Sequence, residues 1–254
     1  MITATPQSAP PVIRPFRVLG RAVTGVLVEE WHKLTVLPGL RLRLGPRAFP
    51  LTLGSTALVM VMWLGQMTTA GSSAVVWIGG VSARLPIDVA VARFPGSMFA
   101  PAPNLPVWGS LAQVLLVFGL AEAWLGAGRT LGISLLATAL SSLGGRLMCE
   151  LGPHHLLGLP YQASLLLDTG PSSAVVALMV YVCLRQGAWL GLTATIIVMV
   201  GELVVLPNMA GREHIIAIVT ALLAALPLLA RDRQRHRVPL PVADFVRLSA
   251  RCRA

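Results

Sequence analysis

Six runs of apolar residues dominate the pattern of hydrophobic and polar positions along this chain. They extend from Phe49 to Met67, Pro106 to Trp124, Leu131 to Met148, Ala174 to Leu184, Trp189 to Leu206 and Ile215 to Ala230. A helix of ~20 apolar residues crosses the hydrocarbon core of a bilayer, and most of these runs approach that length. The pattern therefore predicts an all-α, polytopic membrane protein built as a six-transmembrane-helix bundle with a short fourth helix.

The composition supports this fold class and excludes others. Hydrophobic residues make up 55% of the 254 residues and charged residues only 12%, with a mean hydropathy of +0.75. An ordinary soluble domain has roughly twice that charged fraction, and a disordered chain has far fewer apolar residues. Abundant Gly and Pro without short alternating strands favour packed membrane helices over a β-barrel.

The distribution of basic residues predicts the topology. With six spans, 16 of the 20 Lys and Arg residues fall on the side that holds both termini, and four fall on the other side. The positive-inside rule then places both termini in the cytoplasm of a plasma-membrane protein. We expect a basic cytoplasmic tail at 1–47, a membrane domain at 48–230 and a second basic tail at 231–254. Residues 13–44 form either an amphipathic helix on the inner membrane surface or a solvated tail.

The fourth run is too short for a full span, and it begins with candidate chemistry. A helix from Ser172 to Leu184 rises about 18 Å, against a hydrocarbon core of ~30 Å. We therefore expect this helix to begin inside the membrane, beside a water-filled cavity open to the outside. Ser172 lies in its first turn, where free N–H groups and the helix dipole can stabilise an oxyanion.

The sixth run supplies a possible base for this serine. We expect His214 to begin its helix near the same outer surface, followed by small residues at Ala217 and Ala221. Ser173 and Ala177 form a similar stripe on the fourth helix, and such stripes let membrane helices approach closely. Close packing would bring Ser172 and His214 together as a base-activated nucleophile. The alternative is that Ser172 is an ordinary packing serine.

Three sequence blocks resemble the rhomboid family of intramembrane serine proteases, with a form closest to actinobacterial rhomboid-like proteins. The first, Phe118-Gly119-Leu-Ala-Glu122-Ala-Trp-Leu-Gly126, resembles the family's G-x-x-x-E-x-x-x-G junction, with Glu122 and Gly126 in place. The second is Gly170-Pro-Ser172-Ser173, similar to the G-x-S-x motif. The third is His214 with Ala217 and Ala221, where the family has His-x-x-Gly-x-x-x-Gly.

The resemblance implies peptide-bond hydrolysis in the membrane by a Ser172–His214 dyad that needs no cofactor or metal. Gly170, Ser173 and Ser110 would support the oxyanion site, Glu122 and Gly126 the fold, and Ala177, Ala217 and Ala221 the helix packing. The implied partners are single-span membrane proteins in the lipid bilayer. No nucleic-acid partner is expected, because topology explains the basic residues.

One departure from the family pattern leaves the activity open. Alignment on Glu122 places Pro106 and Ser110 where the family has a His and an Asn that assist the oxyanion. The chain is therefore either a protease or a pseudoprotease that binds transmembrane helices without cutting them. A third alternative, a transporter component, would need more buried charge or repeated broken helices.

Three acidic residues near the candidate dyad have different expected roles. Asp168 and Glu213 are expected to be helix-start acids that stabilise a helix dipole. Glu202, inside the fifth run, is either a functional carboxylate or one that reaches water.

Overall fold

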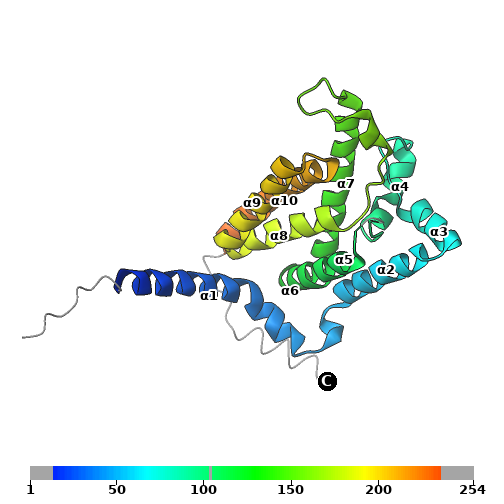
Figure 1. Cartoon of the computed structure of the whole chain (residues 1–254). Helices are drawn as coiled ribbons and strands as arrows, with labels where there is room; N and C mark the ends of the chain where they lie inside the picture. The colour runs from blue at the N-terminus through cyan, green and yellow to red at the C-terminus, as the bar shows by residue number, and fades with distance from the viewer. Residues whose placement is uncertain (1–13, 103–104, 236–254) are drawn as a thin grey trace, which may run out of the picture.

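The computed structural model describes the backbone of residues 14–102 and 105–235, and the side chains of 24–102 and 105–227. Within this part, all regular secondary structure is helical, and the helices are joined by turns and loops (Figure 1). One isolated antiparallel bridge joins Val81 to Asp168. This confirms the predicted all-α fold class.

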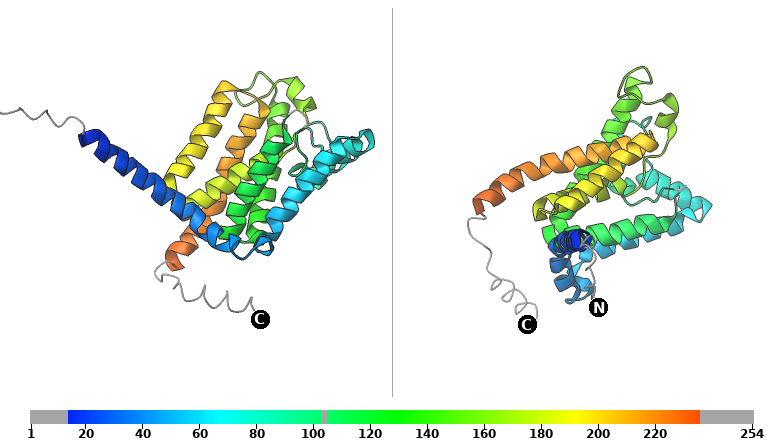
Figure 2. Two further views of the ribbon diagram at one scale, coloured as in Figure 1. Left: turned by 60° about the horizontal axis from the view of Figure 1, so that its bottom comes forward. Right: turned by 60° about the vertical axis from the view of Figure 1, so that its left-hand side comes forward.

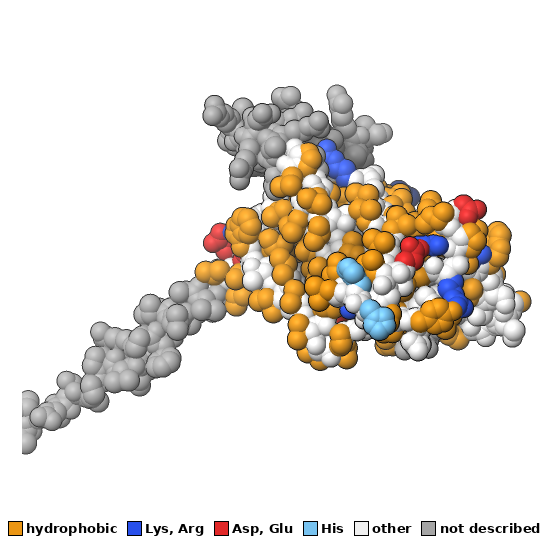
Figure 3. All heavy atoms as spheres, turned by 90° about the horizontal axis from the view of Figure 1, so that it is seen from above, with side chains coloured by type: hydrophobic (Ala, Val, Ile, Leu, Met, Phe, Trp, Pro, Cys, Tyr) orange, Lys and Arg blue, Asp and Glu red, His pale blue; other side chains and the backbone are white. Residues whose placement is uncertain are grey.

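All six predicted apolar segments are helical. They form α2 (Pro50–Gln66), the continuous stretch of α5 (Val107–Gln113), a π-helical turn (Val114–Phe118) and α6 (Gly119–Leu125), then α7 (Ala127–Leu151), α8 (Ser172–Gln186), α9 (Trp189–Val205) and α10 (Met209–Arg235). Among the residues that the structure describes, three stretches are long and apolar enough to cross a membrane: Val107–Leu125, Ala127–Leu151 and Met209–Pro227. Figure 3 shows a face of the molecule that is covered mostly by hydrophobic side chains. The structure is therefore compatible with a helical membrane protein.

Helix α8 lies at the centre of the bundle (Figure 1). Ten of its fifteen residues are buried, and Tyr181 and Leu178 are almost completely inaccessible. It packs against α10 over the largest interface in the described structure and also contacts α7 and α9. Its fifteen residues rise only about 22 Å. The helix is therefore shorter than the hydrocarbon core of a bilayer, which is ~30 Å thick.

Small residues line the contact between α8 and α10. Ala177 on α8 and Ala217 and Ala221 on α10 are fully buried in one shared core, and Ala225 is buried one turn further on. The absence of larger side chains lets the two helix backbones approach closely.

Two helices appear in a stretch that the sequence pattern treated only as a loop. The segment between the first two runs forms α3 (Thr69–Gly79) and α4 (Ile87–Ser97), and α4 packs against α7. A Cβ on Gly79 would lie only 2.8 Å from the Gly96 backbone, so both helices need glycine where they meet. Both helices are short and contain glycine, so they do not form the long apolar runs that predicted the other helices.

The predicted N-terminal tail contains α1 (Arg14–Leu42), which extends away from the bundle (Figures 1 and 2). Its C-terminal half is anchored, because Trp124 Nε1 donates to the Leu34 carbonyl at 2.8 Å. The helix agrees with one of the two alternatives for 13–44, and its position on a membrane surface stays a prediction. Helix α10 continues five residues beyond the predicted boundary at 230, and residues 1–13 and 236–254 of the tails lie outside the described residues.

Glu122, from the first of the three sequence blocks, joins α6 to the start of α2. Its side chain is buried, and its carboxylate accepts hydrogen bonds from the Leu51 and Thr52 backbone N–H groups and from the Thr52 hydroxyl, at 3.0, 2.7 and 2.7 Å. It therefore caps the N-terminus of α2 from a distant part of the chain. Gly126 separates α6 from α7 with a φ of +80°, a conformation that favours glycine.

We expect Glu122→Ala to lower the unfolding free energy by about 3 kcal/mol, because it leaves buried donors at the start of α2 without an acceptor. Reversible unfolding in mixed detergent micelles would measure this loss. The matched control is Glu150→Ala on α7, whose carboxylate is exposed and forms only an i,i+4 pair with Arg146. Equal effects of the two variants would contradict the capping role of Glu122.

Candidate functional site

Ser172 is the first residue of α8, as its position in the fourth run predicted. The loop before it is held to the α3–α4 region by two backbone hydrogen bonds, from Asp168 N to Val81 O at 2.7 Å and from Gly170 N to Ser97 O at 2.9 Å. Gly170 has a φ of +122°, which a residue with a side chain rarely adopts. These contacts determine the point at which the chain enters α8.

The N-terminus of α8 has no side-chain cap. Pro171 precedes the helix, Ser172 is half-buried and Ser173 is buried. Within the described residues, no hydrogen bond engages the backbone N–H groups of Ser172 and Ser173. Two donors at the positive end of a helix dipole therefore lie beside the Ser172 hydroxyl, as an oxyanion site requires.

His214 lies inside α10 rather than at its start, which corrects the expectation from the sequence. The helix begins at Met209, and the Asn208 side chain caps it by accepting a hydrogen bond from Gly211 N at 2.9 Å. Asn208 follows Pro207, and this Pro-Asn pair is the sequence signal for a helix start that the apolar pattern missed. The earlier start turns His214 into the protein, where it is buried.

Glu202 on α9 contacts His214 directly. Glu202 Oε2 lies 2.8 Å from His214 Nδ1. The side chain of Glu202 is 26% exposed and that of His214 is 9% exposed, so the contact lies at the edge of the interior. Glu202 therefore has a partner in the protein while part of its side chain is exposed, and the contact does not decide between the two alternatives for this residue.

The other ring nitrogen of His214, Nε2, has no partner in the described part of the chain. Nε2 is buried, and no hydrogen bond reaches it from any residue that the structure describes. The Ser172 hydroxyl likewise makes no hydrogen bond to His214 among these residues, so direct contact within the dyad stays a prediction. Hydrogen bonds between catalytic groups are often long without substrate and shorten when substrate binds.

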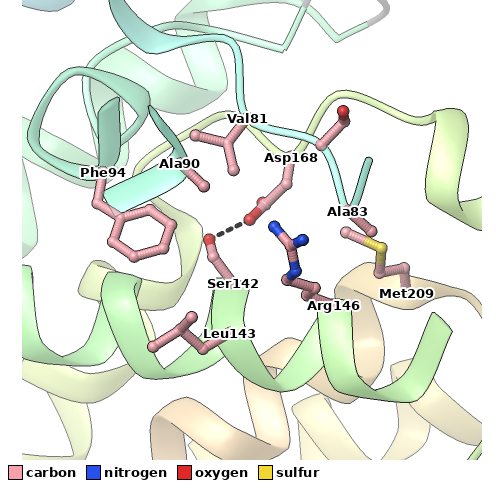
Figure 4. A pocket seen from close by; sticks show the side chains of 10 residues that line it. Val81, Ala83, Ala90, Phe94, Ser142, Leu143, Arg146, Asp168 and Met209 are labelled. Atoms are coloured by element: carbon pink, nitrogen blue, oxygen red, sulfur yellow. Dashed lines mark hydrogen bonds between the residues drawn. The ribbon is translucent and has the colours of Figure 1, made fainter. Parts of the chain in front are cut away.

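Asp168 brings the starts of α8 and α10 together. It lies four residues before Ser172 and interacts electrostatically with His214 and with the Glu213 carboxyl. Its carboxylate also accepts a hydrogen bond from the Ser142 hydroxyl on α7 (Figure 4). Asp168 therefore joins the loop before α8 to α7 and α10, and no described hydrogen bond joins Ser172 itself to His214.

Asp168 and Glu213 are not helix-start acids, contrary to the expectation from the sequence. Asp168 precedes the first turn of α8, and Glu213 is the fifth residue of α10 with its side chain buried against α7. Its backbone carbonyl accepts a hydrogen bond from the Ser141 hydroxyl at 3.0 Å. Burial raises the pKa of the Asp168 carboxyl above its usual range, and Ser142, Glu213 and His214 each oppose part of that rise.

The pocket next to Asp168 is small. It is lined by Ser142, Arg146, Phe94 and Met209 among others, and its volume of about 10 Å³ is close to the minimum for one water molecule (Figure 4). It therefore cannot hold an extended peptide.

The two residues that depart from the family pattern provide little for an oxyanion. Pro106 is exposed at the start of α5 and has no N–H group, and Ser110 is half-buried on the same helix. Neither forms a side-chain hydrogen bond within the described part of the chain. Among those residues, no three His, Cys, Asp or Glu side chains are grouped so that they could hold a metal ion.

Comparison with known proteins gives no family model and no curated protein that matches this chain. The functional assignment therefore depends on the geometry and chemistry of the residues described above.

We expect Gly145→Ala to destabilise the contact between α7 and α10, because the new methyl group would overlap Glu213 Oε1. Overpacking of this kind costs about 1–3 kcal/mol, so the thermal midpoint in detergent should fall. Gly132→Ala on the same helix is the matched control, since a Cβ there meets nothing within 4 Å. If both variants melt alike, Glu213 does not pack against Gly145.

The raised pKa of Asp168 predicts a pH-dependent stability. As pH rises above about 4, Asp168 ionises first in the unfolded chain. The folded state therefore loses stability until the pH passes the raised pKa. Asp168→Asn retains an acceptor for Ser142 and removes this titration. Its thermal midpoint should therefore rise relative to that of the wild type as the pH increases from the unfolded to the folded pKa of Asp168. Parallel melting curves against pH would contradict the assignment.

Proposed function

We propose that this protein is a rhomboid-like intramembrane serine protease. The single observation that carries this proposal concerns α8 and α10 as far as the structure describes the chain: Ser172 begins a short, buried helix without a side-chain cap, and α10, packed along it, holds a buried His214 whose Nε2 has no partner. Six apolar helical segments, α2, α5 to α6, α7, α8, α9 and α10, cross the plasma membrane in this proposal. Both termini then lie in the cytoplasm, in agreement with the excess of basic residues near them.

The proposed chemistry needs only groups that the chain supplies. His214 Nε2 accepts the proton of the Ser172 hydroxyl as Oγ attacks the carbonyl carbon of a substrate peptide. The resulting oxyanion is stabilised by the free N–H groups at the start of α8. His214 then donates the proton to the departing amine, and a water molecule hydrolyses the acyl-enzyme by the same steps.

The short length of α8 favours substrates that are themselves membrane-spanning segments. Since α8 rises about 22 Å, Ser172 lies below the surface of a core ~30 Å thick when the other end of α8 is at the opposite boundary. A single-span protein can reach this depth from the lipid, provided that its helix unwinds near the scissile bond.

A second candidate function is that of a pseudoprotease that binds transmembrane helices without cutting them. Pro106 and Ser110 favour it, because an active rhomboid has two polar oxyanion-supporting side chains there. Loss of one oxyanion donor typically lowers the rate by 10²- to 10³-fold.

We expect a fluorophosphonate probe to label the purified, detergent-solubilised wild type, and expect Ser172→Ala and His214→Ala to abolish labelling. The probe reacts only with an activated serine, which the dyad supplies. Ser134→Ala is the matched control, because this buried serine bonds only within α7, to the Thr130 carbonyl at 2.8 Å, and should leave labelling unchanged.

Absence of labelling in a folded wild-type sample would contradict the protease and favour the pseudoprotease. Labelling that persists in Ser172→Ala would remove this serine as the nucleophile, whichever other residue reacts.

A further inference from the structure

The geometry points to Glu202 as a positioning residue that fixes His214 in the tautomer with a free Nε2 lone pair, which makes the proposed dyad a Ser172–His214–Glu202 arrangement. This inference rests on the proposed function for its catalytic consequence. The contact between Glu202 and His214 is observed in the structure and does not depend on that function.

The connection between α9 and α10 brings these two side chains together. The helices are joined by a turn of three residues, so the last turn of α9 lies beside the first turns of α10. Gly211 allows a close approach, since a Cβ there would lie 3.2 Å from Leu203 Cα. Glu202 Oε2 then reaches His214 Nδ1 at 2.8 Å.

The chemistry of the two groups decides which nitrogen carries the proton. An ionised carboxylate only accepts hydrogen bonds, so Nδ1 must be the donor in this contact. A second N–H at Nε2 would be a buried donor without a partner, which costs free energy. The neutral ring with its lone pair on Nε2 avoids that cost. The nitrogen that faces the protein interior is therefore ready to accept a proton.

The same contact stabilises the ring once it has accepted a proton. Nδ1 still donates to Glu202, and the carboxylate balances the new positive charge on the imidazolium. Asp168 adds a further negative group near His214, but it is already bound to Ser142 and forms no hydrogen bond to the ring among the described residues. Glu202 is consequently the carboxylate that can orient the imidazole.

The functional test compares the labelling rate of Ser172 by fluorophosphonate in Glu202→Gln, Glu202→Asp and wild type. We expect a fall of about 10²- to 10⁴-fold in Glu202→Gln, because a neutral amide neither fixes the tautomer nor balances the charge. Glu202→Asp should recover most of the rate, since it restores the carboxylate. Glu150→Gln, at an exposed carboxylate on α7, is the control. Rates within threefold of wild type in Glu202→Gln would overturn the inference.

A spectroscopic test does not depend on activity. In ¹⁵N-histidine-labelled protein, with the His214 signals assigned from their loss in His214→Asn, the shifts should show a proton on Nδ1. In Glu202→Leu the fraction of the ring that is protonated on Nδ1 should fall, because Nδ1 loses its acceptor. A wild-type His214 protonated on Nε2 would overturn the inference even in an active protease. The expected tautomers in a protein that the probe does not label would support the contact and reject the proposed function.

Discussion

Burial of polar groups in an apolar surrounding is the constraint on which the rest of this structure depends. A backbone or side-chain polar group that leaves water inside a bilayer must find its partner within the protein. The chain meets this requirement with long-range contacts, such as Glu122 at the start of α2 and Ser142 on Asp168. The N-terminus of α8 and Nε2 of His214 are left without such partners among the described residues. These are the groups that the proposed reaction would use.

The contacts of the loop before α8 determine the position of the candidate site. Bonds to Val81 and Ser97 on one side, and the cluster of Asp168 with Ser142 and Glu213 on the other, hold the loop at both edges. Helices α7 and α10 and the α3–α4 region therefore determine where the chain enters α8. The proposed nucleophile would then be positioned by rigid elements, which is the arrangement that effective catalysis needs.

The sequence predicted the helices far better than the contacts between them. Apolar runs identified all six segments, because length and hydropathy are local properties. The start of Ser172's helix was also predicted, since Gly-Pro before a Ser and an apolar run is a local signal. The helices α3 and α4 were missed because their stability comes from packing against α7 and against each other. The roles of Asp168 and Glu213 were wrong for the same reason: their partners, Ser142 and Gly145, lie on a different helix. Glu202 and His214 could have been paired from the sequence, because they flank a Pro-Asn turn at nearly equal distances.

The location of the phosphonate adduct tests the central claim most directly. Peptide mapping of the labelled wild type by mass spectrometry should find the adduct on Ser172 alone, and only when His214 is intact. An adduct on Ser173 or on another serine, or an adduct on Ser172 that forms equally well in His214→Ala, would contradict the claim that His214 activates this serine.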